Sequence, residues 1–154
     1  MRAGVPLLLL VSLVAATATS ARAQNVTAVI TGGPVSFPAP TAADYNNGFV
    51  NDGTPLTYTL TLSTGAASTT TVAIHSSSAN LGGGKALSDL QWRRGDLVAW
   101  NAMTTANVTV QSVQLTAGTP YSNTIFFRTL LSWTADAPAT HSANLVVAIS
   151  VTTP

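Results

Sequence analysis

Cysteine and glutamate are absent from this sequence, and charged residues of every kind are scarce. Only 7% of the 154 residues are charged, whereas about 25% is usual in a soluble domain. Without cysteine the chain has no disulfide and no thiolate that could serve as a nucleophile or a metal ligand. A folded form must therefore be held together by its buried core alone, even in an oxidising compartment.

Groups suited to acid–base or metal chemistry are equally few. The histidines are His75 and His141, and every carboxylate side chain is an aspartate. No G-x-S-x-G nucleophile motif and no spacing of zinc ligands occurs. The run at residues 82–85, GGGK, lacks the rest of a phosphate-binding motif, since Ala79 and Ala86 occupy the required positions. We therefore expect no catalytic residues, no cofactor and no enzymatic activity.

Two further motifs have both a functional and an ordinary interpretation. Aspartates and asparagines cluster at residues 44–52 and could offer oxygens to calcium, but Gly48 is out of register with a calcium-binding loop. The same residue types dominate metal-free turns, so we expect no metal site. Arg94-Gly95-Asp96 spells a tripeptide that integrin ligands present, yet it also suits a hairpin turn. We favour the turn.

The N-terminus has the order of segments found in a secretory signal peptide. Arg2 supplies a positive charge, residues 5–16 are almost wholly apolar, and the small residues Ala21 and Ala23 precede a cleavage position before Gln24. The alternative is a transmembrane anchor, but the apolar run is shorter than the ~20 residues that cross a bilayer. We expect residues 1–23 to be a cleaved signal and residues 24–154 to form one domain that is secreted, periplasmic or displayed at the cell surface.

Cleavage at that position changes the charge balance. The mature chain keeps Lys85, Arg93, Arg94 and Arg128 against five aspartates, which gives a formal net charge of −1. No basic patch remains that would neutralise phosphates, so nucleic acid is excluded as a partner. No later segment is apolar enough to span a membrane. Threonine and serine hydroxyls must supply most of the hydrated surface, which is typical of strand proteins.

The clearest structural pattern is a pair of long strands within residues 123–151. One face of the first strand carries Ile125, Phe127, Leu131 and Trp133. The second strand alternates apolar residues from Ala143 to Val151, after a turn at residues 135–140. Because successive strand side chains point to opposite faces, each strand presents one continuous apolar surface.

A second pair of strands is predicted in the first half of the mature chain. Residues 56–63 place Leu56, Tyr58, Leu60 and Leu62 on one face, and residues 70–76 place Val72 and Ile74 on one face. The turn at residues 65–67 between them predicts that the two strands pair as a hairpin.

Shorter strands complete the pattern. They are predicted at residues 25–30 and 108–115, and in a tight hairpin that joins residues 87–92 to residues 97–100, whereas residues 35–37 are a brief apolar segment before two prolines. The apolar phase of residues 108–115 changes near Ser112, which indicates a β-bulge. Residues 77–86 are interpreted as a flexible loop, and no segment after the signal has a helical period. We predict an all-β fold, an antiparallel immunoglobulin-like β-sandwich of seven to eight strands, with a closed barrel as the alternative.

The three tryptophans could be buried or could bind a ligand. Trp133 shares a strand face with Phe127 and Leu131, so we expect it in the core. Trp92 and Trp100 flank the same predicted hairpin and are the candidates for an exposed pair that stacks against sugars. Core packing is the other interpretation of that pair.

The C-terminal segment resembles a known family. Residues 136–143, DAPATHSA, followed by an alternating terminal strand, are similar to the ending of secreted bacterial spore coat protein U-like domains. Residues 90–100 and the segment Gly33-Pro34-Val35-Ser36-Phe37 are similar to earlier parts of those domains, although His141 stands where tyrosine is usual and the family's cysteines are missing. The resemblance implies a pilin-like sandwich associated with surface pili, biofilm and adhesion, without catalytic residues.

These observations lead to two functional hypotheses. The first is an exported, non-enzymatic structural or adhesive protein of the bacterial cell surface, such as a pilin-like subunit that joins other copies by strand exchange. The exchanged strand would consist of Asn25, Val26, Thr27, Ala28, Val29 and Ile30. The alternative is a monomeric secreted module that binds a glycan or another surface ligand through Trp92, Trp100 and the glycines at residues 82–84.

Overall fold

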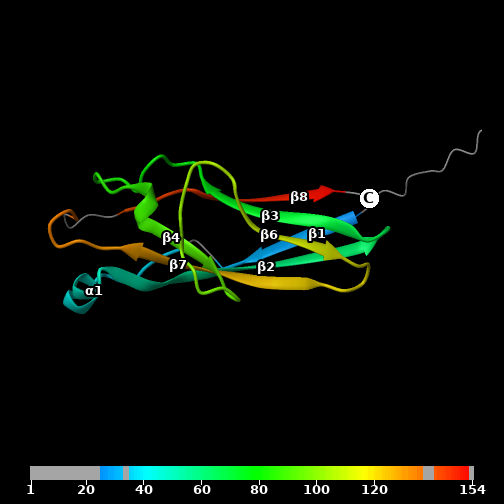
Figure 1. Ribbon diagram of the computed structural model, residues 1–154, viewed down its shortest axis with the longest axis horizontal. Helices are drawn as coiled ribbons and strands as arrows, with labels where there is room; N and C mark the ends of the chain where they lie inside the picture. Colours follow the sequence, from blue (N-terminus) through cyan, green and yellow to red (C-terminus); the bar gives the residue numbers. More distant parts are fainter. Residues whose placement is uncertain (1–24, 33–34, 137–140, 153–154) are drawn as a thin grey trace, which may run out of the picture.

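A computed structural model of the protein describes residues 25–32, 35–136 and 141–152 (Figure 1). The predicted signal peptide and its cleavage position lie outside these residues. Strands are the main regular structure of the described chain, and no helix in it is long and apolar enough to cross a membrane. Its elements are β1 Asn25–Thr31, α1 Ala42–Asn47, β2 Phe49–Thr64, β3 Ser68–Ser76, η1 Leu87–Asp89, β4 Leu90–Arg94, β5 Asn101–Ala102, β6 Val108–Leu115, β7 Tyr121–Leu130 and β8 Leu145–Thr152.

The strands form two antiparallel sheets that lie one above the other (Figure 1). A five-stranded sheet has the order β1-β2-β7-β4-β5, and a three-stranded sheet has the order β6-β3-β8. This confirms the predicted all-β antiparallel sandwich. The described strands form two separate sheets, so the closed-barrel alternative is wrong. The immunoglobulin-like arrangement of the strands stays a prediction.

The predicted hairpin of residues 56–63 and 70–76 is wrong, because the chain changes sheets at the turn between these two strands. β2 pairs with β1 and β7 in the five-stranded sheet, whereas β3 pairs with β6 and β8 in the three-stranded sheet. β7 and β8 are likewise in different sheets. Two strands with an apolar face can cover each other across the core as well as lie side by side. Alternation in the sequence identifies the buried face but not the neighbouring strand.

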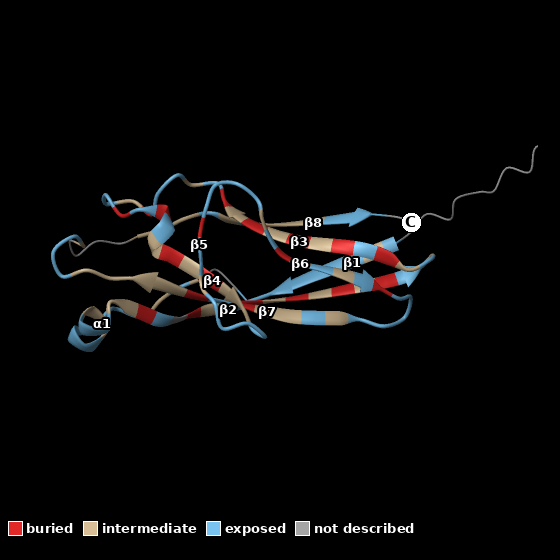
Figure 2. Cartoon of the chain, in the orientation of Figure 1, coloured by how far each residue is buried: buried red, intermediate tan, exposed pale blue. Residues whose placement is uncertain are grey.

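The predicted inward faces of β2 and β3 are confirmed, as are Ile125 and Phe127 of β7, whereas Val151 at the end of β8 is 41% exposed. The side chains that pack between the sheets include Leu56, Tyr58, Leu60 and Leu62 of β2, Val72 and Ile74 of β3, and Ile125 and Phe127 of β7, all at most 8% exposed. Figure 2 shows the buried positions alternating with less buried ones along β2 and β3. Burying each such aliphatic or aromatic side chain contributes about 1.5–3 kcal/mol, so this interleaved layer is the main source of stability.

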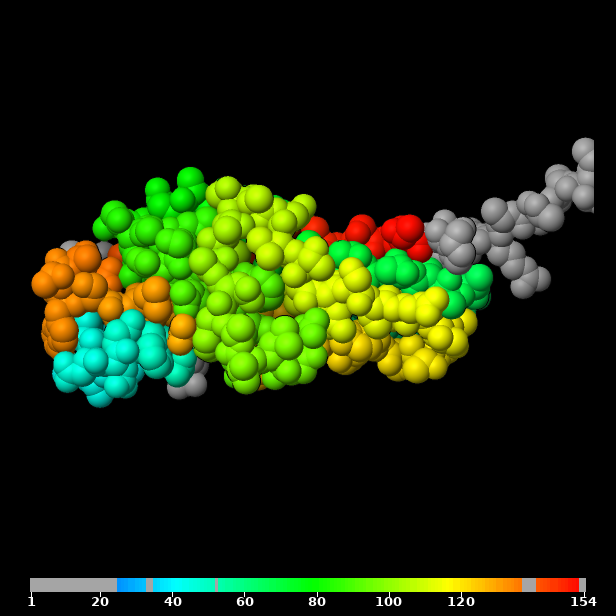
Figure 3. Space-filling model, viewed as in Figure 1, coloured from blue at the N-terminus to red at the C-terminus, as the bar shows by residue number. Residues whose placement is uncertain are grey.

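Trp133 is not in the core, contrary to the prediction. The strand pattern stops when β7 ends at Leu130, and Trp133 lies in the following turn with 61% of its surface exposed. Its ring stacks on Tyr45 at 4.5 Å between centroids, and its Nε1–H donates to Oδ1 of Asn46 at 3.2 Å. Figure 3 shows this segment, in orange, lying against the cyan region of α1 at one end of the molecule.

The helix α1 was not predicted, because six residues are too short to show a helical period. Its ends do carry recognisable signals. Thr41 Oγ1 accepts from the backbone N–H of Asp44, and the Asp44 carboxylate accepts from the backbone N–H of Thr41 at 2.8 Å, which forms a capping box. The backbone N–H and the hydroxyl of Thr41 both donate to the Asp44 carboxylate and lower the pKa of Asp44. Gly48, at φ 78°, ends the helix in the left-handed conformation.

Residues 87–92 and 97–100 do not pair with each other as the predicted hairpin. Residues 87–89 form a 3-10 turn, and β4 pairs with β5, where Trp92 lies opposite Asn101. Residues 97–100 form the loop that connects them, with 92% of Val98 exposed. The apolar residues of this loop were mistaken for a strand because a short apolar run has no period long enough to identify it.

The predicted β-bulge in residues 108–115 is present, slightly earlier than expected. Val72 faces Gln111 and Ala73 faces Thr109, so Val110 is the extra residue in β6. Both Val110 and its neighbour Gln111 therefore turn toward the interior of the sandwich.

Candidate functional sites

The strand β1 lies at the edge of the five-stranded sheet and has β2 as its one neighbour among the described strands. The pairing runs from Asn25 opposite Thr64 to Thr31 opposite Thr57. Figure 2 shows β1 in the colour of exposed residues along most of its length. Val26 packs against the core, whereas Val29 is 57% and Ile30 44% exposed. The strand is thus attached mainly by its main chain.

Few side-chain hydrogen bonds strengthen this attachment. Ser63 Oγ donates to the carbonyl of Asn25 at 3.0 Å, and Thr27 Oγ1 donates to the carbonyl of Thr61 at 3.4 Å. The six residues predicted to form an assembly strand therefore lie together on one exposed edge strand. The outer edge of such a strand carries main-chain groups that can pair with another strand.

Trp92 is buried, so Trp92 and Trp100 do not form an exposed pair. Trp92 is 3% exposed and packs in the core, opposite Phe127 in the neighbouring strand β7. Its two neighbours along β4, Gln91 and Arg93, are on the opposite face of the strand and are more exposed. Residues that flank one hairpin need not share a face, because strand side chains alternate. The predicted two-tryptophan platform is therefore wrong, and Trp100 alone remains half-buried at the surface.

Trp100 takes part in an alternating series of guanidinium groups and aromatic rings, which we call the guanidinium–aromatic stack. Arg128 Cζ lies 4.6 Å from the centroid of Trp100 and 5.0 Å from that of Phe49. Arg93 Cζ lies 5.2 Å from the centroid of Trp100 and 4.9 Å from that of Phe126. Each contact is within the range of a favourable cation–π interaction. The sequence did not reveal the series, because it is assembled from β2, β4, β7 and a loop.

An open hollow of about 410 Å³ adjoins the stack. It is lined by Asn51, Gly53, Pro55, Arg93, Trp100, Phe126 and Phe127. Arg93 Nη1 donates to the carbonyl of Leu97 at 2.8 Å, and Arg128 Nε donates to Oε1 of Gln91 at 2.7 Å. Partial burial lowers the pKa of Arg128. The hollow therefore combines flat apolar rings, an amide and a guanidinium.

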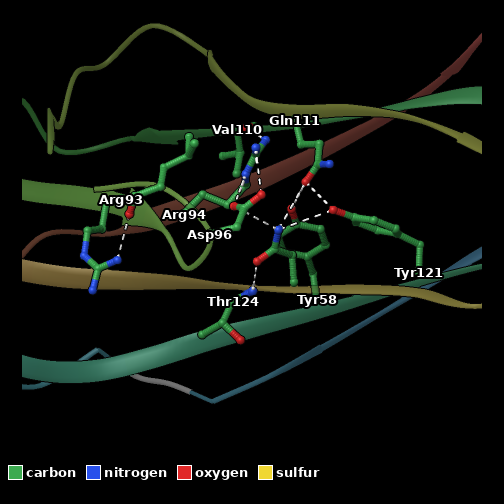
Figure 4. A network of polar contacts seen from close by, with 10 residues as sticks. Tyr58, Arg93, Arg94, Asp96, Val110, Gln111, Tyr121 and Thr124 are labelled. Carbon is green, nitrogen blue, oxygen red and sulfur yellow. Dashed lines mark hydrogen bonds and ion pairs between the residues drawn. The ribbon is translucent and has the colours of Figure 1, made fainter. Parts of the chain in front are cut away.

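A polar network joins the two sheets elsewhere in the sandwich (Figure 4). Gln111 Oε1, from β6, accepts from the hydroxyl of Tyr121 at 2.6 Å and from that of Tyr58 at 3.1 Å. Arg94 Nη1 donates across the sheets to the carbonyl of Val110 at 3.1 Å. Burial raises the pKa of Tyr58 to about 12. These contacts link β6 of one sheet to β2, β7 and β4 of the other and need no ligand.

The Arg94-Gly95-Asp96 tripeptide belongs to this network, in a turn as predicted (Figure 4). The Arg94 guanidinium donates to both carboxylate oxygens of Asp96, with Nη2 to Oδ2 at 3.0 Å. Asn123 Nδ2 also donates to Asp96, at 3.3 Å. The hydrogen bonds from Arg94 are the main reason that the pKa of Asp96 is lowered. Arg94 and Asp96 thus pair with each other instead of presenting separate charges to a receptor.

The three glycines at residues 82–84 form a defined turn where a flexible loop was predicted. All three have positive φ, at 79°, 59° and 82°, a conformation that other residues adopt at a cost. The turn directs Lys85 inward, where it is 5% exposed. Lys85 Nζ lies 2.7 Å from Asp136 Oδ1 and 3.3 Å from Asp89 Oδ2. The glycine run therefore serves to bury a charge pair.

A cavity of about 580 Å³ adjoins this charge pair, between the two sheets. Its walls are mostly apolar, with Phe37, Val50 and Leu131 among them, and they include Lys85 and His141. His141 Nδ1 is 3.0 Å from the carbonyl of Gly82. Because Lys85 already has two carboxylate partners, the cavity holds no unpaired charge that would select a ligand.

The described residues contain no group of three histidine, cysteine or acidic side chains placed to hold a metal ion. Asp44 and Asn46, from the predicted turn cluster, direct their oxygens to Thr41 and to Trp133.

The chain matches no protein-family model, no curated protein and no solved structure in the comparisons made with it.

Proposed function

We propose that the protein is an exported, non-enzymatic structural or adhesive component of the cell surface, and that its copies join by exchanging β1. The observation that supports this proposal is the placement of β1. It is an edge strand with exposed Val29 and Ile30, attached mainly by main-chain hydrogen bonds. Main-chain pairing at a sheet edge can be repeated by an identical strand from another copy.

The edge that β1 covers is well suited to accept such a strand. β2 keeps its inner face buried through Tyr58, Leu60 and Leu62 whichever copy supplies β1. A strand from another copy would restore the same register and the same hydrogen bonds. The main free-energy cost of exchange is therefore the entropy lost when two copies associate. The cost of detaching β1 is chiefly its ladder and the core contact of Val26.

The sequence is consistent with this role in two ways. The N-terminal 23 residues have the pattern of a secretory signal, which would place the mature chain outside the cytoplasm. The chain also resembles spore coat protein U-like domains, which are associated with surface pili and adhesion. The resemblance and the export signal support the proposal, and the exchange of β1 is the step to be tested.

The first test compares the mass of two forms of the protein. We expect residues 24–154 to form multimers that persist in detergent, and residues 32–154, which lack β1, to stay folded and monomeric. Light scattering gives the mass, and circular dichroism checks the fold. A synthetic peptide of residues 24–31 should bind the shortened form. Multimers formed by the shortened form would refute the proposal.

The second test uses the absence of cysteine, which makes engineered thiols unambiguous. Val29 of β1 faces Thr59 of β2, and directly opposed residues in an antiparallel pair are close enough for a disulfide. The double variant Val29→Cys, Thr59→Cys should give a covalent ladder when multimers are oxidised, because each bond would link two copies. The single variant Val29→Cys is the matched control and gives covalent dimers at most. If oxidation of these multimers forms the disulfide only within single copies, the multimers assemble without strand exchange.

A further inference from the structure

The four cationic side chains of the described chain fall into two groups. Lys85 and Arg94 each form salt bridges with aspartates and hold parts of the fold together. Arg93 and Arg128 have no salt bridge to any carboxylate whose side chain the structure describes. Both contact the ring of Trp100 instead. Among the carboxylates whose side chains the structure describes, none is paired with these two guanidinium groups, and both groups lie against one ring.

This arrangement has an electrostatic cost in the absence of a ligand. Both guanidinium carbons lie about 5 Å from the Trp100 centroid, so the two positive charges are within about 10 Å of each other, a separation at which like charges still repel at moderate salt. The aromatic quadrupoles offset part of that repulsion. An anion bound near both groups would remove the rest.

The guanidinium groups are also positioned to donate hydrogen bonds. Arg93 uses one nitrogen on the carbonyl of Leu97, and Arg128 uses one on Gln91. The remaining N–H groups of each planar fork have no hydrogen-bond acceptor among the backbone and side-chain groups that the structure describes. A guanidinium held flat by aromatic rings loses little rotational freedom when it pairs with a carboxylate in a bidentate manner.

We propose that the guanidinium–aromatic stack and its adjoining hollow form a binding site for an acidic saccharide, with uronic acid units as the chemical class. Guanidinium groups of Arg93 and Arg128 pair with sugar carboxylates, Phe126 offers an apolar surface to the pyranose ring, and Asn51 is placed to bond hydroxyls. The hollow is of a size that takes one or two sugar units. The site shares no residue with β1.

A polynucleotide fits these observations less well. Its affinity comes from many phosphate contacts along a track of basic residues, whereas this face offers two guanidinium groups in a mature chain with a net charge of −1. A sugar acid needs fewer charges, because flat apolar rings and hydroxyl contacts share the recognition.

The test is a titration of the protein, residues 24–154, with a galacturonate tetramer and with the uncharged galactose tetramer. Tryptophan fluorescence reports binding, and the Trp133→Phe variant removes the exposed tryptophan that lies outside the site. We expect saturable binding of the acidic tetramer, weakened by added salt, and at least tenfold weaker binding of the neutral one. Equal affinity for both would refute the inference, and so would tighter binding of a polynucleotide than of the acidic tetramer.

Variants locate the site. Arg93→Gln and Arg128→Gln should each weaken binding by about tenfold or more, the usual loss for a charge-assisted hydrogen bond. Arg94→Gln is the matched control, because Arg94 lies next to Arg93 on the opposite face of β4, where it pairs with Asp96. Thermal denaturation verifies that each variant is folded. Unchanged affinity in both Arg93→Gln and Arg128→Gln, or an equal loss in Arg94→Gln, would place the binding elsewhere and overturn the assignment.

Discussion

The buried charge pair of Lys85 and Asp136 makes a strong prediction about stability. The side chain of Lys85 is 3% exposed and that of Asp136 is 8% exposed, with 2.7 Å between Nζ and Oδ1. In a Lys85→Met variant, Asp136 keeps the backbone N–H of Ser132, at 2.8 Å, but loses its positive partner. Removing one member of a buried pair costs about 3–5 kcal/mol, because the other charge stays buried without compensation. Such a loss is a large part of the roughly 5–15 kcal/mol that stabilises a typical domain.

A double variant separates the cost of an orphaned charge from the value of the pair. Lys85→Met with Asp136→Leu removes both charges beside an apolar cavity, while Asp89 remains 31% exposed to solvent. Replacing both members by apolar groups of similar volume is often close to neutral. We therefore expect the double variant to recover most of the stability that the single variant loses, as measured by urea unfolding followed by circular dichroism.

The pH dependence of the free energy of unfolding tests the same charge pair in a second way. Burial raises the pKa of Asp136, but hydrogen bonds from Lys85 and Ser132 outweigh it, and the pKa lies below its usual value. A carboxylate with a lowered folded-state pKa stabilises the fold above about pH 4 and loses that contribution as the pH falls further. In Lys85→Met, burial prevails over the remaining hydrogen bond, so acidification toward about pH 4 should relieve part of the defect. A loss below about 1 kcal/mol at neutral pH, or an unchanged pH profile, would refute the reasoning.

Three further changes test other parts of the structure. Thr70 is fully buried and its Oγ1 has no hydrogen bond within the described chain, so Thr70→Val should raise the free energy of unfolding by about 1 kcal/mol, whereas Thr71→Val, which loses a bond to Ser112, should not. Burial raises the pKa of Tyr58 to about 12, above its unfolded value of about 10. The contribution of Tyr58 to the free energy of unfolding is therefore present below about pH 10 and is lost as the pH rises toward 12. Unfolding measurements on Tyr58→Phe should not show that loss at alkaline pH. Trp133→Phe should remove the most strongly acrylamide-quenched part of the fluorescence, because Trp92 is 3% exposed and Trp100 is half-buried. A largely unchanged quenching would contradict the exposed position of Trp133.

Alternation in the sequence was sufficient to predict which side of each long strand is buried. The period-two pattern of residues 56–63 identified the four inward side chains of β2, and the same rule identified Val72 and Ile74. The pattern could not show that β2 and β3 are in different sheets. Sheet membership depends on how the whole set of strands closes over one core, which no local window contains.

The candidate sites depend on contacts between distant segments, which explains why the sequence revealed them only in part. β1 was identified because a short run of alternating residues is a local pattern. The guanidinium–aromatic stack needs the register of β4 and β7, which places Arg93 opposite Phe126 and Arg128 opposite Gln91. The buried position of Lys85 needs three successive glycines with positive φ, which a sequence reader interprets equally well as flexibility.

The two proposals fit together through the positions of β1 and the guanidinium–aromatic stack. β1 covers residues 57–64 of β2, whereas the stack contacts β2 at Phe49, the first residue of the strand, and otherwise uses β4, β7 and the loop that holds Trp100. Exchange of β1 would therefore leave the stack of every copy accessible. A multimer would present many identical sites to a long acidic polysaccharide, and linked sites can bind about 10²-fold more tightly than single ones without any new contact. Residues 24–154 should then bind polygalacturonate far more tightly than residues 32–154 do, while both bind the galacturonate tetramer equally. Equal affinities for the polymer would mean that the two properties are unconnected.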